Sequence, residues 1–192
     1  MRKIVLDEVL DLTGYEKARN EFRARAIAAK EVRRIGLGDL ITVFFENRLT
    51  MHYQLQEMMR TERMVKDEQI REEMAVWNGL VPGTDELSMT LMIEQTDHSK
   101  VKETLHELSG LEGHVALRIG EREVRAAFEP GRSDENVVAA VQYLKFKLSP
   151  AEREALLRDD DVRVAIDHPR YRAETRLPRA TLEALREDVR SE

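Results

Sequence analysis

Residues 87–94 of the chain read LSMTLMIE, and this stretch decides the fold class. An apolar residue occupies every odd position, whereas serine, threonine, methionine and glutamate fill the even ones. Successive side chains of a strand point to opposite faces of its sheet, so this period of two predicts a strand with one drier face. The same alternation recurs at 115–119, 124–128, 144–148 and 162–166, and 171–176 is expected to return antiparallel to the last of these. Hairpins therefore dominate the second half of the chain.

The first half has helical patterns instead. Helices are expected over residues 7–11, 15–34, 48–65 and 67–77, with one buried strand at 40–45. In the third of these helices Met51, Leu55, Met58 and Val65 form an apolar stripe. Gly36 and Gly38 are expected to end the helix before the strand. Further helices are expected at 100–109, at 150–158 behind a Ser149 capping box, and at 178–189.

The order of these elements shows no regular alternation of strand and helix, which argues against a doubly wound parallel sheet. We therefore predict an α+β fold, with a largely antiparallel sheet and helices packed on it. Residues 1–192 are interpreted as one domain. A subdivision near 78–85 is possible, because Asn78, Gly79, Pro82 and Gly83 separate a helical part from a sheet-rich part.

Composition excludes several classes of protein. The 192 residues carry a formal net charge of -6, which argues against a protein whose main task is to neutralise nucleic-acid phosphates. The absence of cysteine excludes disulfides, thiolate metal sites and cysteine nucleophiles. No stretch approaches the ~20 apolar residues that span a bilayer, and the first residues lack the apolar core of a signal peptide. The cytoplasm is the expected location.

Two short motifs resemble parts of known cofactor or metal sites. Gly36-Leu37-Gly38 precedes a strand instead of following one, so it does not fit a dinucleotide loop. Glu103 and His106 have the spacing used in di-iron bundles, but a second copy is missing and a solvated helix face fits better. We therefore predict no metal and no cofactor, and no residue is assigned a catalytic role.

The densest polar cluster lies at the junction of the strand 40–45 and the helix that follows. Its candidate ligand-binding residues are Glu46, Arg48, Tyr53, Gln56 and Glu57. The first turn of a helix presents free N–H groups, so Arg48 beside it could help to hold an anion. His168, in the run Asp167-His168-Pro169-Arg170-Tyr171, is the sixth candidate because imidazole titrates near neutrality. The alternative is that these groups only fix the helix against the sheet; His52, His98 and His114 are interpreted as ordinary surface or packing residues.

At these two clusters the sequence resembles an uncharacterised bacterial family known as domain of unknown function 3501. The resemblance rests on Phe45-Glu46-Asn47-Arg48, on Tyr53-Gln54-Leu55-Gln56-Glu57-Met58, and on Asp167-His168-Pro169 with Tyr171-Arg172. It covers nearly the whole chain and supplies no catalytic residue. Because genes of this family often lie near those of rubrerythrin-like and iron–sulfur redox proteins, it implies a role beside an electron-transfer or peroxide-defence system, with such proteins as candidate partners.

Two functions follow from these observations as expectations. The first is an accessory or interaction protein that binds a partner or itself as a homo-oligomer, using the Met-rich helix Met51 to Met64 as its surface. The second is a small-ligand or metal-binding protein, or an enzyme, whose site combines the cluster at 46–57 with His168. The second expectation requires these residues to converge on one cavity.

Overall fold

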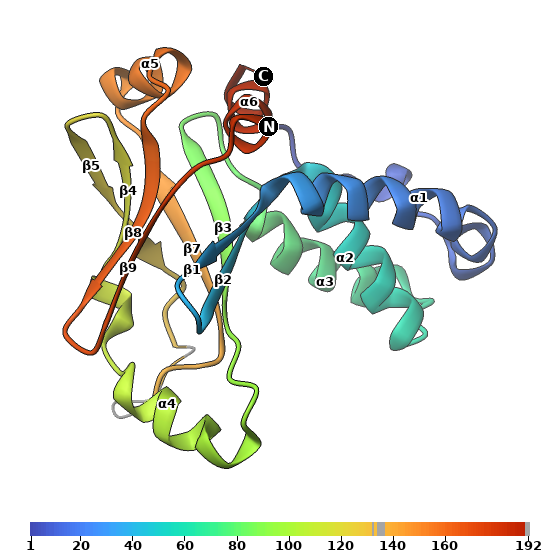
Figure 1. Cartoon of the computed structure of the whole chain (residues 1–192). Coiled ribbons are helices and arrows are strands. Elements are labelled where there is room, and N and C mark those ends of the chain that lie inside the picture. Colours follow the sequence, from blue (N-terminus) through green and yellow to red (C-terminus); the bar gives the residue numbers. More distant parts are fainter. Residues whose placement is uncertain (132, 134–136, 191–192) are drawn as a thin grey trace.

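The computed structural model describes residues 1–131, 133 and 137–190, and these form an α+β fold built on two antiparallel sheets (Figure 1). The five-stranded sheet has the order β1 (Arg34–Leu37), β2 (Ile41–Glu46), β3 (Glu86–Ile93), β7 (Val141–Lys147) and β6 (Ala127–Phe128). The four-stranded sheet has the order β5 (Arg122–Arg125), β4 (Val115–Ile119), β8 (Val162–His168) and β9 (Tyr171–Arg176). The α+β class and the antiparallel pairing are confirmed; the strands divide between two sheets.

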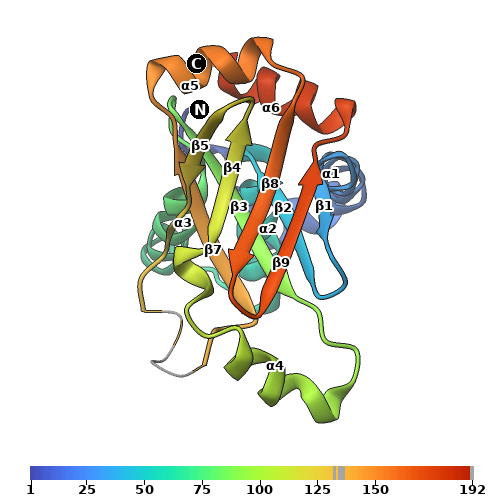
Figure 2. The ribbon, with the colours of Figure 1, turned by 60° about the vertical axis from the view of Figure 1, so that its left-hand side comes forward.

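The main core lies between the two sheets, which are stacked one in front of the other in Figure 2. Val43 and Leu91 from the larger sheet, and Leu117 and Val164 from the smaller one, are fully buried there. Helices α5 (Pro150–Arg158) and α6 (Arg179–Arg190) close one end of this sandwich, and α4 (Val101–Glu107) lies at the other end. Burial of apolar surface between the sheets is the main stabilising contribution to the fold.

A second core forms where α1 (Leu12–Arg33), α2 (Arg48–Thr61) and α3 (Asp67–Leu80) pack beside the larger sheet (Figure 1). Met51, Leu55 and Met59 of α2 are each 1% exposed or less and contact this core together with Trp77. Met51 and Met59 therefore lie in the interior and are not available to a partner, whereas Met58 and Met64 are partly buried.

The apolar stripe of α2 ends earlier than its spacing predicts. The helix stops at Thr61, Arg63 follows with a positive φ of 52°, and Val65 lies outside the helix with 71% of its surface exposed. A left-handed residue breaks the helical hydrogen-bond ladder. Met59 takes the buried position that the stripe assigned to Met58, which is only partly buried.

Two strand boundaries also differ from the sequence prediction. Strand β1 begins at Arg34, directly after α1, and pairs with β2 through Ile35 and Val43; Gly36 lies inside it and does not end the helix. The run 124–128 divides at Ala126, so that β5 pairs with β4 in one sheet and β6 pairs with β7 in the other. Both features depend on which strands pair with each other, and local sequence patterns do not reveal that pairing.

Other local predictions are confirmed. Ser149 caps α5 with Pro150 in its first turn, and the Ser149 and Glu152 side chains each accept a hydrogen bond from the other residue's backbone N–H. Strands β8 and β9 form the expected hairpin around Pro169 and Arg170. No helix within the described ranges is long and apolar enough to cross a membrane.

Candidate functional site

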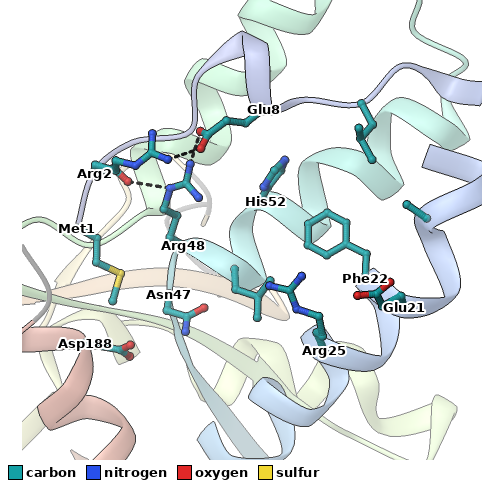
Figure 3. A pocket seen from close by; sticks show the side chains of 13 residues that line it. Met1, Arg2, Glu8, Glu21, Phe22, Arg25, Asn47, Arg48, His52 and Asp188 are labelled. Carbon is teal, nitrogen blue, oxygen red and sulfur yellow. Dashed lines mark hydrogen bonds and ion pairs between the residues drawn. The ribbon is translucent and has the colours of Figure 1, made fainter. Parts of the chain in front are cut away.

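A cavity lies between the N-terminal segment, α1, the first turns of α2 and the last turn of α6, and we call it the N-terminal cleft (Figure 3). Its volume is about 640 Å³. Charged and apolar side chains share its wall, namely Met1, Arg2, Glu8, Leu10, Ala18, Glu21, Phe22, Arg25, Asn47, Arg48, Leu49, His52 and Asp188. Of the six predicted site residues, Arg48 alone belongs to this lining.

Arg48 is held in place by the N-terminal segment. Its guanidinium forms an ion pair with Glu8, and its Nε donates to the Arg2 carbonyl oxygen at 3.2 Å. Arg2 pairs with the other oxygen of the same carboxylate. The Nη1 group of Arg48 forms no hydrogen bond with a described residue, so one corner of the guanidinium stays available to the cleft.

The base of the cleft is fixed by Asn47 and Asp188. Asn47 caps α2, because its Oδ1 accepts from the Thr50 N–H at 3.0 Å. Its amide also hydrogen-bonds Asp188, which accepts two bonds of 2.9 Å from Nη2 of Arg33. Burial raises the pKa of Asp188 despite these partners. Three elements are thereby joined at one point, since α1, α2 and α6 each contribute one residue.

His52 follows Arg48 by one helical turn and lines the same wall. Its ring meets Phe22 edge to face, with centroids 5.1 Å apart. Burial lowers the pKa of His52, as does the Arg48 guanidinium, so the imidazole is neutral at pH 7. Its Nε2 is buried without a hydrogen-bond partner among the described residues. An unpaired buried nitrogen beside a cavity is uncommon in folded proteins and marks this wall as incompletely satisfied.

Gln56 and Glu57 anchor other segments to α2. The Gln56 side chain is 1% exposed; its Oε1 accepts from the Leu10 N–H at 2.8 Å, and its amide donates to the Leu10 carbonyl oxygen at 3.1 Å. Glu57 accepts from the Tyr15 hydroxyl at 2.6 Å and from both Nε and Nη2 of Arg19. The Arg19 hydrogen bonds lower the pKa of Glu57, with a smaller contribution from Tyr15 in the same direction. Gln56 and Glu57 therefore fasten the N-terminal segment and α1 to α2, which is the structural role expected as the alternative to ligand binding.

Tyr53 and Glu46 point to still other neighbours. Tyr53 packs edge to face on Phe22, with centroids 6.2 Å apart. Glu46 is 5% exposed at the end of β2, where its Oε1 accepts from the Thr90 hydroxyl at 2.7 Å. Its Oε2 has no partner among the residues that the structure describes, and it lies outside the lining of the N-terminal cleft.

His168 does not join the other five candidates. It ends β8, at the hairpin with β9, on the side of the molecule away from α2 (Figure 1). Its Nε2 donates to the Ser109 carbonyl oxygen at 3.0 Å, and its Nδ1 accepts from the Arg170 N–H at 3.3 Å. The six candidates therefore do not converge on one cavity, because the five-stranded sheet lies between β8 and α2 (Figure 1).

Asp167 pairs with His114, which was expected to be an ordinary surface or packing residue. His114 Nδ1 lies 3.0 Å from Asp167 Oδ1, and Arg125 donates to both oxygens of the same carboxylate. These hydrogen bonds, that of Arg125 above all, lower the pKa of Asp167. This cluster belongs to the outer face of the four-stranded sheet. Within the described parts of the chain, no group of three or more histidine, aspartate or glutamate side chains is arranged to hold a metal ion.

Sequence reasoning missed most of the residues that line the cleft, among them Phe22, Arg25 and His52. A signal exists, because Ala18, Phe22 and Arg25 follow one another at spacings of four and three and so share one face of α1. Glu21 and Glu31 are interleaved with the arginines of this helix, and that pattern is typical of a solvated face. Residue spacing within one helix does not show that this face of α1 lies opposite the first turns of α2, so the two walls of the cleft could not be brought together from the sequence.

The fold and the cleft define an α+β protein with two stacked antiparallel sheets and a polar cavity in its helical layer. The chain belongs to the family described as "Protein of unknown function (DUF3501)", whose model matches residues 3–189. A crystal structure of a "novel protein of unknown function" from Burkholderia pseudomallei shares 29% sequence identity, with a TM-score of 0.91 over 98% of this chain and 100% of that one. No curated protein matches the chain.

Proposed function

We propose that this protein binds a small molecule in the N-terminal cleft. The observation that carries the proposal is the cavity itself, because its volume of about 640 Å³ lies in the range typical of small-ligand sites. Its wall combines apolar side chains, among them Phe22 and Leu49, with charged and amide groups that can orient a ligand.

Two polar groups of the cleft, Arg48 and Asn47, are fixed before any ligand arrives. Arg48 is oriented by Glu8 and by the Arg2 carbonyl oxygen, and Asn47 is held by the first turn of α2. Groups that are already ordered lose little conformational entropy on binding, which favours affinity. This preorganisation supports a binding role more strongly than a loose arrangement of surface charges would.

A fragment screen by ligand-observed NMR tests the proposal. The wild type is compared with Ala18→Trp, which places an indole in the cleft, and with Ala24→Trp, an exposed position of the same helix outside the lining. The proposal predicts that fragments bind the wild type and Ala24→Trp and fail to bind Ala18→Trp. Equal binding to all three proteins, or to none, would contradict it.

A second candidate function is the accessory role in the cytoplasm, beside a rubrerythrin-like or iron–sulfur redox partner. It is favoured by two exposed apolar side chains on the α2–α3 side of the helical layer, Val65 and Val76, which are 71% and 56% exposed. Apolar side chains at such positions are suited to contact another protein or a second copy of the chain. Sedimentation of the purified protein, alone and mixed with a rubrerythrin, tests this role. An assembly that forms with the wild type and dissociates in the Val65→Asp or Val76→Asp variant supports it. Monomers in both samples contradict it.

A further inference from the structure

The cleft holds one cation that no carboxylate neutralises. Arg25 projects from α1 toward the interior of the cleft (Figure 3), and it forms no ion pair or hydrogen bond with a residue that the structure describes. Glu21 precedes it by one helical turn and lines the cleft, but the two side chains make no ion pair. An unpaired guanidinium in a cavity is a binding group for an anion.

The other charges of the cleft are largely satisfied. Arg2 and Arg48 share the Glu8 carboxylate, and Asp188 is paired with Arg33 behind the wall. The lining carries three arginines, Arg2, Arg25 and Arg48, and three carboxylates, Glu8, Glu21 and Asp188, while Arg33 pairs with Asp188 from outside the lining. His52 adds no charge at neutral pH, because its pKa is lowered by burial. Glu8 and Asp188 are thus each paired with arginines other than Arg25, which leaves the Arg25 guanidinium to pair with one negative charge of a ligand.

The rest of the wall offers apolar surface. Phe22 precedes Arg25 by about one turn of α1, and Leu49 follows Arg48 directly in α2, so each arginine has an apolar neighbour in the lining. The Phe22 ring is held edge to face by His52 and Tyr53, with interplanar angles of 80° and 78°. A rigid aromatic wall suits a flat or apolar ligand body.

We infer that the ligand is a small organic monoanion, a carboxylate attached to an apolar or aromatic body. The carboxylate binds between the Arg25 guanidinium and the free Nη1 corner of Arg48, and the body lies along Phe22 and Leu49. Charge-assisted hydrogen bonds from arginine are among the strongest that a protein forms with a carboxylate. This inference rests on the proposed small-molecule function and names its ligand class.

Calorimetric titration with benzoate, and with its neutral analogue benzamide, tests the inference. The wild type is expected to bind benzoate about tenfold more tightly than benzamide, since the neutral analogue cannot form a charge-assisted hydrogen bond with arginine. Arg25→Gln is expected to weaken benzoate binding about tenfold and to leave benzamide binding unchanged. Arg23→Gln removes the same charge from an exposed position outside the lining and is expected to bind benzoate like the wild type. Arg25→Lys, which keeps the charge, is expected to bind benzoate with an affinity between those of the wild type and Arg25→Gln.

The outcomes separate this inference from the function on which it rests. If Ala18→Trp abolishes fragment binding but benzamide binds as tightly as benzoate, or Arg25→Gln binds benzoate like the wild type, the ligand class is overturned and the cleft remains a binding site. If benzoate fails to bind the wild type while neutral fragments bind, the same conclusion holds. If no fragment and neither probe binds, both proposals fail together.

Discussion

Glu57 shows how a polar residue on α2 can be structural. The Tyr15 side chain is fully buried, and its hydroxyl donates its hydrogen bond to Glu57, whose carboxylate also receives both donors of the Arg19 fork. These contacts join α1 to α2 across the helical layer. Residue type and spacing alone could not distinguish this role from ligand binding, because both use the same side chains.

Replacing Glu57 with alanine is therefore expected to lower stability and to spare binding. The variant leaves the buried Tyr15 hydroxyl without an acceptor, a loss of about 1 to 3 kcal/mol. Thermal unfolding should show a melting temperature several degrees lower, with benzoate titration unchanged. Glu68→Ala, at an exposed position in the first turn of α3, is the matched control. Lost benzoate binding at an unchanged melting temperature would refute this role.

His52 is expected to make the free energy of unfolding fall as the pH is lowered. Its pKa in the folded state lies below the ordinary value of 6.5, because burial and Arg48 outweigh the opposing effects of the Glu8 carboxylate and backbone. The unfolded state therefore binds the proton first as the pH falls. The stabilisation is complete above pH 6.5 and is lost as the pH falls from 6.5 through the folded-state pKa.

Urea unfolding between pH 7.5 and pH 5 measures this effect. The wild type should lose stability over that range, and His52→Gln should lose less, because it removes the group whose pKa is lowered. His98→Gln, at an exposed position, should follow the wild type. Parallel curves for the wild type and His52→Gln would show that the histidine is not the source.

At the scale of elements, the predictions that succeeded depend on local chemistry. The cap at Ser149 lies within four residues of every group that it uses, so the start of α5 could be predicted from the sequence. The end of α2 and the existence of β1 could not, because a left-handed Arg63 and pairing with β2 decide them. The cleft depends on the contact between α1 and α2, which no spacing within either helix reveals.

The Ser149 cap supplies a test at this scale. Ser149→Ala removes the acceptor of the Glu152 N–H and is expected to cost about 1 kcal/mol in the free energy of unfolding. Ser149→Asp keeps an acceptor and should retain most of the stability. Chemical denaturation of the three proteins measures both values. An alanine variant as stable as the wild type would mean that packing of Leu156 in the core, and not the cap, fixes α5.

At the scale of the whole molecule, the two stacked sheets decide which polar residues can meet. They place His168 at the β8–β9 hairpin, away from α2, although both clusters look similar in sequence. The α+β class and the antiparallel pairing could be predicted from periods of two. The division into two sheets could not, because alternation does not tell which strand pairs with which.

His168→Ala tests this separation. The histidine is 4% exposed and uses both ring nitrogens in hydrogen bonds with the backbone, so its loss is expected to lower the free energy of unfolding by about 1 to 3 kcal/mol. Benzoate binding at a temperature where the variant is folded should equal that of the wild type. Impaired binding in a folded variant would show that the two regions are coupled.

The most direct test of the binding cleft is a chemical-shift map of the nitrogen-15-labelled protein titrated with benzoate. The account predicts that the largest shifts fall on the amides of Phe22, Arg25, Leu49 and His52, which line the cleft on two helices. Shifts concentrated on the outer face of the four-stranded sheet, or no shifts at millimolar benzoate, would contradict it.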